Sequence, residues 1–409
     1  MNDCRPIDVL YVEAPPLAYG SSRSLFSLMS NLDRHRVRPV LACNRENELL
    51  RWAERSGIPA YPLSLPGLPR QNTAQAAKND AQRGAARPPL SPTLKDRLLL
   101  PVRMMRDRLE FKSVRNEIHA VMEKHGTQIL HLNNQISTNR FAYTLGTNAK
   151  IVQHVRDAPL SRSFHASILA QRADRLIAIS RFVAQDVRLA YRKDASDIVA
   201  NPIDAEFKFN ADKRAQLRRA WAVPDDVLLF GQAGRFVEWK GVDLAIDAYV
   251  RLCDDPAFMR STRLVLAGSS ADRSEYFDQC RRRASDLPEG QIRIEPFSDD
   301  PAALFSAFDV TLHPIRKPEA FGRVIIESMA CGSVPVARNR GAIEELISNR
   351  KDGIFFDDVD ALGYWMRFVW DNPAQLEEMR TAGQETAKSY HADAIARRVE
   401  LIYQDLVRA

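Results

Sequence analysis

The stretch "DVTLHPIRKPEAFGRVIIESMACG", from Asp309 to Gly332, combines a strand, a turn and a helix. The apolar run "DVTLHP" is typical of a buried strand, "KPEAFG" contains the proline and glycine of a turn, and "RVIIESMACG" has the apolar spacing of a helix. Strand–turn–helix is the repeating unit of a doubly wound α/β domain. The stretch therefore predicts that fold, with Glu319 in the turn and Glu327 on the helix.

The same alternation runs along most of the 409 residues. Most of the expected strands are continuous apolar runs, as in parallel sheets that helices cover on both faces. The pattern predicts an α/β fold with two doubly wound, Rossmann-like domains. The strands are expected at "DVLYVEA", "RPVLAC", "QILHL", "KIVQHV", "RLIAIS" and "DIVA", and then at "VLLFGQAG", "RLVLAG", "QIRIEP", "DVTLHP", "VPVAR" and "GIFF".

The domain boundary is expected where the first set of strands ends, near Asn201 and Pro202. We expect an N-terminal domain over residues 1–204, a C-terminal domain over residues 205–385, and a helix over residues 386–409 that can return to the first domain.

A basic, flexible insertion is expected over residues 64–115, which begin with a Pro-, Gly-, Ala- and Gln-rich stretch. Residues 70–115 hold eleven Lys or Arg against four Asp or Glu, a net charge of +7, while the whole chain carries +6. The charge is therefore local, which indicates an anionic surface nearby or a solvated face. We expect no nucleic-acid partner.

An apolar stripe crosses the second half of this insertion. Its members are Leu94, Leu98, Val102, Met105 and Leu109, and the arginines among them are Arg97, Arg103, Arg106 and Arg108. Two interpretations stay open. The segment is either an amphipathic helix on an anionic membrane surface, despite Pro101, or a helix whose stripe packs on its own sheet.

Composition narrows the class of protein further. No run of eighteen apolar residues exists, and the N-terminus, with Asp3 and Asp8, resembles a first strand more than a secretory signal. The five cysteines are scattered and show no C-x-x-C spacing, which argues against a disulfide framework and a zinc site. We expect a cytoplasmic protein, including a peripheral location on the cytoplasmic face of the membrane.

Two cations flank a strand-to-helix turn in "GRFVEWKGVDLAIDAY". The strand ends at Gly234, and Arg235 and Lys240 lie in the loop before the helix. Ligands of open α/β sheets bind at the carboxyl ends of strands, where helix N-termini favour phosphate. The two cations suit a pyrophosphate, although an ordinary solvated pair is the alternative.

The two glutamates of the opening stretch are expected to face the same edge of the sheet. Each carboxylate can hold the hydroxyls of one group, while the N–H groups of Phe321 and Gly322 at the helix start can receive phosphate oxygens or sugar hydroxyls. A solvated pair of glutamates would explain neither Pro318 nor the apolar residues around Glu327.

These segments together carry a family resemblance. "GRFVEWKG", followed by "PEAFGRVIIESMACGSVPVARNRGAIEEL", resembles the family-4 retaining glycosyltransferases, whose GT-B fold sets two Rossmann-like domains around a cleft. Their Glu-x7-Glu motif matches Glu319 and Glu327. The resemblance implies that Arg235 and Lys240 bind the diphosphate of a nucleotide-sugar donor, Glu327 the ribose and Glu319 the transferred sugar.

In the first half, the resemblance is looser. "KIVQHVRD" resembles the strand whose histidine reaches the donor sugar, which implies that role for His154, and a buried structural histidine is the alternative. "YGSSRSL" resembles a glycine-rich loop that approaches acceptor or phosphate, with Gly20 and Ser21 in it and Tyr19 where a first glycine is common.

The resemblance implies retention of anomeric configuration with no metal and no other cofactor. A UDP-sugar is the first choice of donor and GDP-mannose the second, and the expected acceptor is a glycan or a lipid-linked glycan of bacterial cell-surface polysaccharide synthesis. Asp358 to Asp360, "DVD", has the form of a metal-binding motif but is expected to be a solvated turn. The competing functions are a sugar-nucleotide epimerase, a non-catalytic nucleotide-sugar-binding module and a glycoside hydrolase, which would need paired carboxylates but no cations.

Overall fold

The computed structural model describes residues 5–16, 20–65, 94–160, 162–268 and 274–408. The chain forms two compact units, one made of Met1–Pro202 with Ala392–Ala409 and the other of Ile203–His391. The division after Pro202 lies close to the boundary expected at residue 204.

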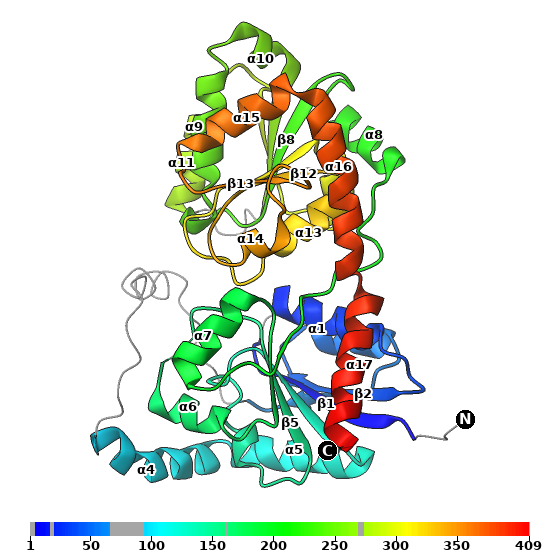
Figure 1. The fold of residues 1–409 in the computed structure, drawn as a ribbon, viewed down its shortest axis with the longest axis vertical. Coiled ribbons are helices and arrows are strands. Elements are labelled where there is room, and N and C mark those ends of the chain that lie inside the picture. The colour runs from blue at the N-terminus through cyan, green and yellow to red at the C-terminus, as the bar shows by residue number, and fades with distance from the viewer. Residues whose placement is uncertain (1–4, 17–19, 66–93, 161, 269–273, 409) are drawn as a thin grey trace. The chain divides into compact units, whose positions relative to one another are not determined.

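The first unit is built on a seven-stranded parallel sheet with the strand order β3-β2-β1-β4-β5-β6-β7 (Figure 1). Its strands are β1 (Ile7–Glu13), β2 (Val37–Asn44), β3 (Ala60–Leu63), β4 (Ile129–Asn133), β5 (Lys150–Val155), β6 (Arg175–Ala178) and β7 (Asp197–Ile198). Its helices are α1 (Gly20–Ser30), α2 (Leu49–Arg55), α4 (Leu94–Glu110), α5 (Lys112–His125), η1 (Ala142–Thr144), α6 (Phe164–Ala170), α7 (Arg181–Tyr191) and α17 (Ala392–Arg408).

One strand of this sheet was not predicted. β3 contains Pro62 and pairs only with β2, so it forms the edge of the sheet. Proline has no N–H to donate and is tolerated at an edge, which weakens the strand signal in the sequence. The other strands lie at the expected apolar runs.

The end of the chain packs in the first unit. Ile395, Val399 and Tyr403 of α17 belong to the same buried core as Val9 and Tyr11 of β1. The Tyr403 hydroxyl donates a hydrogen bond of 2.9 Å to the Tyr11 hydroxyl. One core of the first unit therefore contains residues of both β1 and α17.

The second unit is built on a six-stranded parallel sheet with the strand order β10-β9-β8-β11-β12-β13. Its strands are β8 (Leu228–Ala233), β9 (Thr262–Ala267), β10 (Ile292–Glu295), β11 (Val310–His313), β12 (Val334–Arg338) and β13 (Ile354–Phe356). Its helices are α8 (Ala211–Ala220), η2 (Glu238–Lys240), α9 (Val242–Leu252), α10 (Pro256–Ser261), α11 (Glu275–Ala284), α12 (Pro301–Ala307), α13 (Arg323–Ala330), α14 (Ile343–Leu346), α15 (Ala361–Asp371), α16 (Pro373–Ala387) and η3 (Lys388–Tyr390).

Both sheets are doubly wound, which confirms the predicted fold class. In the second unit the chain starts at β8, adds β9 and β10 on one side, and then crosses to β11 on the other side. The carboxyl ends of β8 and β11 therefore form a topological switch point, where sheets of this kind bind ligands. The cleft expected between the two domains stays a prediction.

The apolar stripe of the basic insertion does not pack on a sheet, so that interpretation of it was wrong. Its four described members on α4 expose large fractions of their surface: Leu98 68%, Val102 62%, Met105 64% and Leu109 66%. Pro101 lies inside α4 without ending it. The rest of the expected loop, residues 66–93, lies outside the described residues. Within the described part of the chain, no helix combines the length and apolarity needed to cross a bilayer.

Candidate functional site

The loop after β8 is shaped by Gly241, which follows the short helix η2. Gly241 adopts a φ of +67°, and a Cβ there would lie 2.1 Å from the carbonyl oxygen of Pro314. Only glycine fits such a close backbone approach in this conformation. The contact therefore brings the loop that carries Lys240 against the loop that follows β11.

The loop after β11 holds Glu319 by its backbone. The Glu319 N–H donates to the carbonyl of Arg340 at 3.2 Å, and the Ala342 N–H donates to the carbonyl of Glu319 at 2.9 Å. A Cβ on Gly341 would collide with the Glu319 backbone at 2.2 Å. Glu319 is thus fixed between the ends of β11 and β12, as the turn predicted from the sequence requires.

Three polar side chains meet at the switch point. The Lys240 Nζ lies 2.8 Å from Oε2 of Glu319, and Nε2 of His313, the last residue of β11, lies 3.3 Å from the same oxygen. Lys240 also lies over the Trp239 ring, 4.1 Å from its centroid. The Lys240 and Glu319 side chains are only 15% and 20% exposed, so water screens their attraction weakly.

Glu319 is held in its ionised form. Burial of its carboxyl opposes ionisation, but the Lys240 charge and the neighbouring His313 outweigh burial, so the pKa of Glu319 lies well below its ordinary value. Burial also lowers the pKa of His313, which keeps that imidazole neutral. Although Nε2 of His313 is buried near Glu319, it has no well-aligned hydrogen bond within the described part of the chain.

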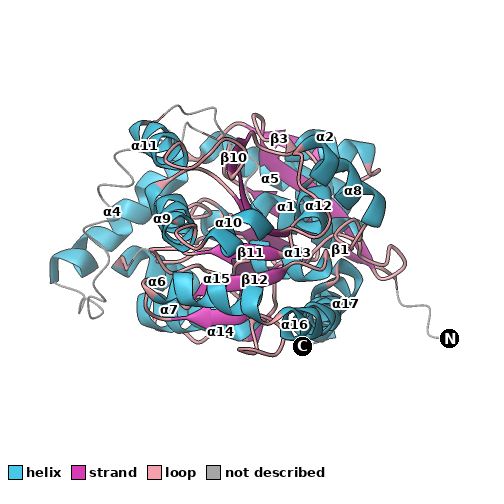
Figure 2. Cartoon of the chain, turned by 90° about the horizontal axis from the view of Figure 1, so that it is seen from above, coloured by secondary structure: helices cyan, strands magenta, loops and turns pink. Residues whose placement is uncertain are grey.

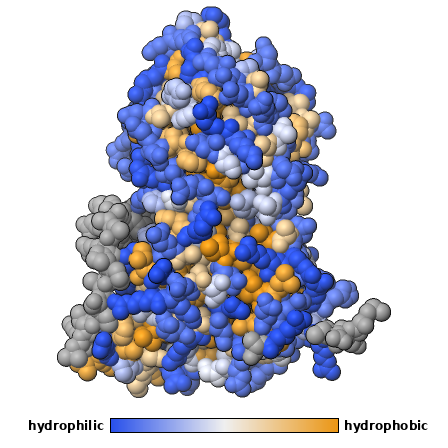
Figure 3. Space-filling model, viewed as in Figure 1, coloured by the Kyte–Doolittle hydropathy of each residue, from blue (hydrophilic) through white to orange (hydrophobic). Residues whose placement is uncertain are grey.

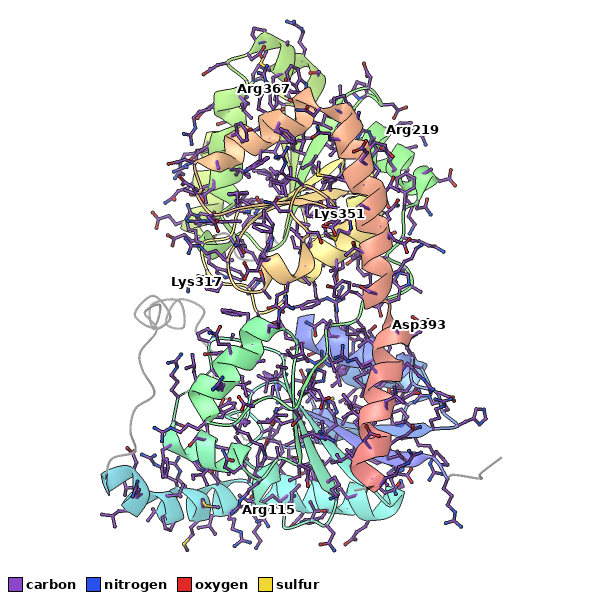
Figure 4. The ribbon with its side chains drawn as sticks, in the orientation of Figure 1. Arg115, Arg219, Lys317, Lys351, Arg367 and Asp393 are labelled. Atoms are coloured by element: carbon purple, nitrogen blue, oxygen red, sulfur yellow. The ribbon has the colours of Figure 1, made fainter. Side chains whose placement is uncertain are left out.

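Arg316 was not predicted as a site residue, yet it ties the two loops together. Its guanidinium donates to both carboxylate oxygens of Asp243, at 2.7 and 2.6 Å, and to the carbonyl of Glu238 at 2.8 Å. Tyr276 donates to the same carboxylate at 2.6 Å. In the sequence Arg316 is one cation in a polar loop, and only the pairing of β8 with β11 sets it beside α9. The loop after β11 also contains Lys317, which is labelled in Figure 4.

The start of α13 offers the predicted donor groups. Gly322 caps the helix with a φ of +99° and has no side chain to occupy the first N–H groups. No residue in the described ranges accepts a hydrogen bond from the N–H of Phe321 or Gly322. Glu327 lies on α13 as predicted, only 8% exposed, and its Oε1 accepts from Arg323 at 2.8 Å. Arg323, spaced four residues before Glu327, was detectable as an ion-pair partner but was not predicted.

Arg235 lies in the same loop as Lys240 and is exposed. Among the residues that the structure describes, none forms an ion pair with it.

Gly268, directly after β9, is explained by packing, because a Cβ there would lie 2.1 Å from the carbonyl oxygen of Gly234. The glycine therefore marks a close approach of two strand ends.

His154 lies in the first unit, near the end of β5, and is only 1% exposed. Arg156 donates to its Nδ1 at 3.2 Å, so the proton of the neutral imidazole resides on Nε2, because a guanidinium cannot accept. Burial, followed by the Arg156 charge, lowers the pKa of His154 well below its ordinary value. This environment favours the structural interpretation that the sequence left open.

The first unit contains a buried carboxylate that the sequence did not reveal. Glu13, at the end of β1, is fully buried and accepts hydrogen bonds from Ser22, Asn133 and Asn134 at 2.7, 2.6 and 2.9 Å. Burial raises its pKa. Asn133 in turn accepts from Arg156 at 2.6 Å, so one network joins the ends of β1, β4 and β5. A single acid at the end of an apolar run gave no sequence signal.

The remaining predicted residues lie at helix starts and turns. Gly20 and Ser21 open α1, whereas Tyr19 lies outside the described residues. Asp358 and Asp360 are exposed, and Asp358 accepts from the Asp360 N–H at 3.0 Å in the turn before α15. Within the described ranges, no three His, Cys, Asp or Glu side chains are grouped to hold a metal ion.

Solved structures share this fold. A glycosyltransferase from Rickettsia africae matches with a TM-score of 0.77 and 17% identity, covering 98% of this chain and 99% of that one. Anabaena Alr3699/HepE in complex with UDP matches with a TM-score of 0.74 and 17% identity, covering 98% and 100%. At this identity the likeness shows the fold alone, and the predicted GT-B class is confirmed.

Curated relatives are similar to part of the chain. The chain is 27% identical to D-inositol 3-phosphate glycosyltransferase 1 of Catenulispora acidiphila, over 64% of each chain. It is 31% identical to a GDP-mannose-dependent alpha-(1-6)-phosphatidylinositol dimannoside mannosyltransferase of Mycobacterium tuberculosis, over 44% of this chain and 46% of the relative. The chain thus spans less than two thirds of these relatives.

A family model for glycosyl transferases group 1 matches residues 213–386. This match covers the Lys240 loop, β11 and α13, and the resemblance inferred from "GRFVEWKG" and Glu-x7-Glu is confirmed at this level. Over residues 213–386, the chain is therefore similar to the glycosyl transferases group 1 family.

Proposed function

We propose that the chain is a retaining glycosyltransferase that moves a sugar from a nucleoside-diphosphate donor to a glycan or lipid-linked acceptor. The observation that carries the proposal is the meeting of Lys240, His313 and Glu319 at the switch point of the group 1 domain. The Lys240 cation and the N–H groups at the start of α13 suit the negative charge of such a donor. The ionised carboxylate of Glu319 suits its hydroxyls.

The diphosphate is the part of the donor that the cations bind. Arg235 is exposed and makes no ion pair within the described residues, so its charge is available to phosphate oxygens. Lys240 is engaged by Glu319 in the free protein and shares its charge with the incoming diphosphate. The N–H groups of Phe321 and Gly322 at the start of α13 add hydrogen bonds to the same anion.

The carboxylates bind the hydroxyls of the donor. Glu319 is ionised and buried, so it accepts strongly from the hydroxyls of the transferred sugar, and His313 limits the positions that its Oε2 can take. Glu327 has one oxygen engaged by Arg323 and offers the other to the ribose. Because His154 is only 1% exposed, we propose a structural role for it rather than a contact with the donor sugar.

The chemistry that these residues support is stabilisation of a departing anion. As the anomeric C–O bond breaks, negative charge gathers on the diphosphate and the sugar becomes oxocarbenium-like. Preorganised cations and helix N–H groups stabilise that charge without a metal. We propose attack from the same face with the departing phosphate as base, and no protein nucleophile.

The identity of the donor is proposed from the relatives. HepE is described in complex with UDP, and the mycobacterial relative is GDP-mannose-dependent, so a UDP-sugar remains the first choice and GDP-mannose the second. One structural relative, WaaG, takes part in lipopolysaccharide biosynthesis, which supports a cell-surface polysaccharide acceptor on the cytoplasmic side of the membrane.

The test is a panel of UDP- and GDP-sugars, read as thermal stabilisation and as slow donor hydrolysis. Glu319→Gln is expected to abolish turnover while nucleotide binding persists. Glu378→Gln, on an exposed position of α16, is the matched control and is expected to behave as wild type. Full turnover in Glu319→Gln removes Glu319 from the site. Conversion of the donor into an epimeric sugar without any acceptor, rather than simple hydrolysis, supports the epimerase instead.

A further inference from the structure

The outward face of α4 is apolar and exposed. Leu98, Val102, Met105 and Leu109 are spaced by four, three and four residues, so at about 100° per residue they lie in one narrow strip along the helix. Each is more than 60% exposed, which is unusual for four large apolar side chains on one helix face. Figures 1 and 2 show α4 at the margin of the first unit, projecting past α6, and Figure 3 shows apolar atoms at that end of the unit.

The opposite face of α4 is anchored. Asp107 is fully buried, and its two carboxylate oxygens lie 3.4 Å from Nε of Arg140 and 3.4 Å from Nε2 of His165 on α6. Phe111, directly after the helix, is buried and its ring centroid lies 5.6 Å from that of Phe141. Turning the strip inward would expose these groups, so the apolar strip faces away from the unit.

Positive charge borders the strip on both sides. Arg106 lies on one side, Arg97 and Arg108 lie on the other, and all three are exposed. The acids of the helix lie toward the anchored half and are engaged, since Asp96 contacts Arg103 at 3.7 Å and Glu110 contacts Arg140 at 3.1 Å. The outward half of α4 therefore combines apolar surface with positive charge that no acid of the described residues pairs with.

We propose that α4 lies in the surface of an anionic lipid bilayer, with the strip in the boundary between headgroups and acyl chains and the three arginines on lipid phosphates. A helix of this composition has the properties of an interfacial anchor. Charge complementarity favours lipid over a second copy of this chain, whose own arginines would face these arginines across a symmetric contact.

The neighbouring part of the chain is also a poor cover for the strip. Residues 66–93 contain only two large apolar side chains, Leu68 and Leu90, and carry four Lys or Arg against one Asp. Such a composition supplies little apolar surface and would add like charge beside the three arginines. Lipid phosphate and acyl chains match both features of the strip.

The experiment is cosedimentation of the full chain with vesicles of phosphatidylcholine, with and without phosphatidylglycerol, at low and high salt. The wild type is expected to bind the anionic vesicles and to release as salt rises. Leu98→Gln/Val102→Gln/Met105→Gln/Leu109→Gln is expected to weaken binding at least about tenfold, because it removes the inserted surface. Arg97→Gln/Arg106→Gln/Arg108→Gln is expected to weaken it about a hundredfold at low salt, at about fivefold per arginine.

The control is Leu401→Gln/Val407→Gln, which changes two exposed apolar residues of α17 in the same unit and is expected to bind as wild type. All these positions are exposed, so the substitutions are expected to change stability little. Unchanged melting temperatures would establish that the variants fold. Failure of the wild type to bind anionic vesicles, or undiminished binding by the fourfold variant, overturns the proposal. If the wild type self-associates and the fourfold variant is monomeric, the strip binds a second copy of the chain, and the proposal is overturned.

Discussion

Replacing Lys240 by methionine removes the charge that holds Glu319 ionised while keeping an apolar stem of similar length. Removing one partner of a fully buried ion pair costs about 3–5 kcal/mol. This pair is 15% and 20% exposed, so we expect a smaller loss, about 2–3 kcal/mol near neutral pH. For a unit of this size each kcal/mol lowers the melting temperature by about 2–4 °C, which gives a decrease of about 4–12 °C.

The loss is expected to depend on pH with a definite sign. In the wild type the pKa of Glu319 is lower folded than unfolded, so its contribution to stability is present above the unfolded pKa and is lost as pH falls through the folded pKa. In Lys240→Met burial acts without the cation and raises the pKa of Glu319 above the unfolded value. The variant then gains stability as pH falls toward about 4.5, so the difference between the two proteins shrinks from about pH 7 downward.

Thermal unfolding of both proteins across this pH range measures the effect. Lys240→Met/Glu319→Gln removes both charges and is expected to be more stable than Lys240→Met alone at neutral pH. Lys388→Met, whose partner Glu385 is 72% exposed, is the surface control and is expected to cost no more than about 0.5 kcal/mol. A penalty that is independent of pH, or a double variant that is no more stable than the single one, refutes the reasoning.

Four further outcomes are expected. Arg235→Ala weakens the binding of a nucleoside diphosphate by about tenfold or more, because a charge-assisted contact is lost, and unchanged calorimetric affinity removes Arg235 from the site. His313→Phe lowers kcat more than it raises KM, whereas His313→Gln retains an N–H near Glu319 and keeps most activity; equal activities in the two variants would show that His313 does not position the carboxylate. A chelator leaves turnover unchanged, and restoration of lost activity by Mg²⁺ or Mn²⁺ would contradict a metal-independent reaction. His154→Asn lowers the melting temperature and leaves turnover unchanged, because His154 is buried; lower turnover at a constant melting temperature would show instead that it contacts the donor.

The regular parts of the fold could be predicted because parallel strands are read as continuous apolar runs. The run "DVTLHP" predicted β11, and the glycines after it marked the turn and the end of α13. β3 escaped because Pro62 interrupts its short run and because an edge strand has fewer constraints on its composition.

Proximity within the site could be predicted only in part. Glu319 and Glu327 are close in the sequence, so their spacing located them. Lys240 and Arg316 reach their partners because β8 pairs with β11 on one side, although β9 and β10 lie between these two strands in the sequence. Strand order is decided by the packing of whole helices and sheets, and no local pattern records it.

The outward direction of α4 was also beyond the sequence. The spacing of its apolar residues showed a strip, but a strip packs inward in most helices. Asp107 decides the matter, since its burial against Arg140 and His165 anchors the opposite face. In the sequence, Asp107 is only one acid among several arginines.

The structure of the chain with a bound nucleoside diphosphate tests the central claim most directly. We predict the diphosphate at the carboxyl ends of β8 and β11, with its oxygens in hydrogen-bond reach of Lys240 and of the N–H groups of Phe321 and Gly322. A nucleotide bound elsewhere on the protein, with the Lys240–Glu319 pair undisturbed, would contradict the account.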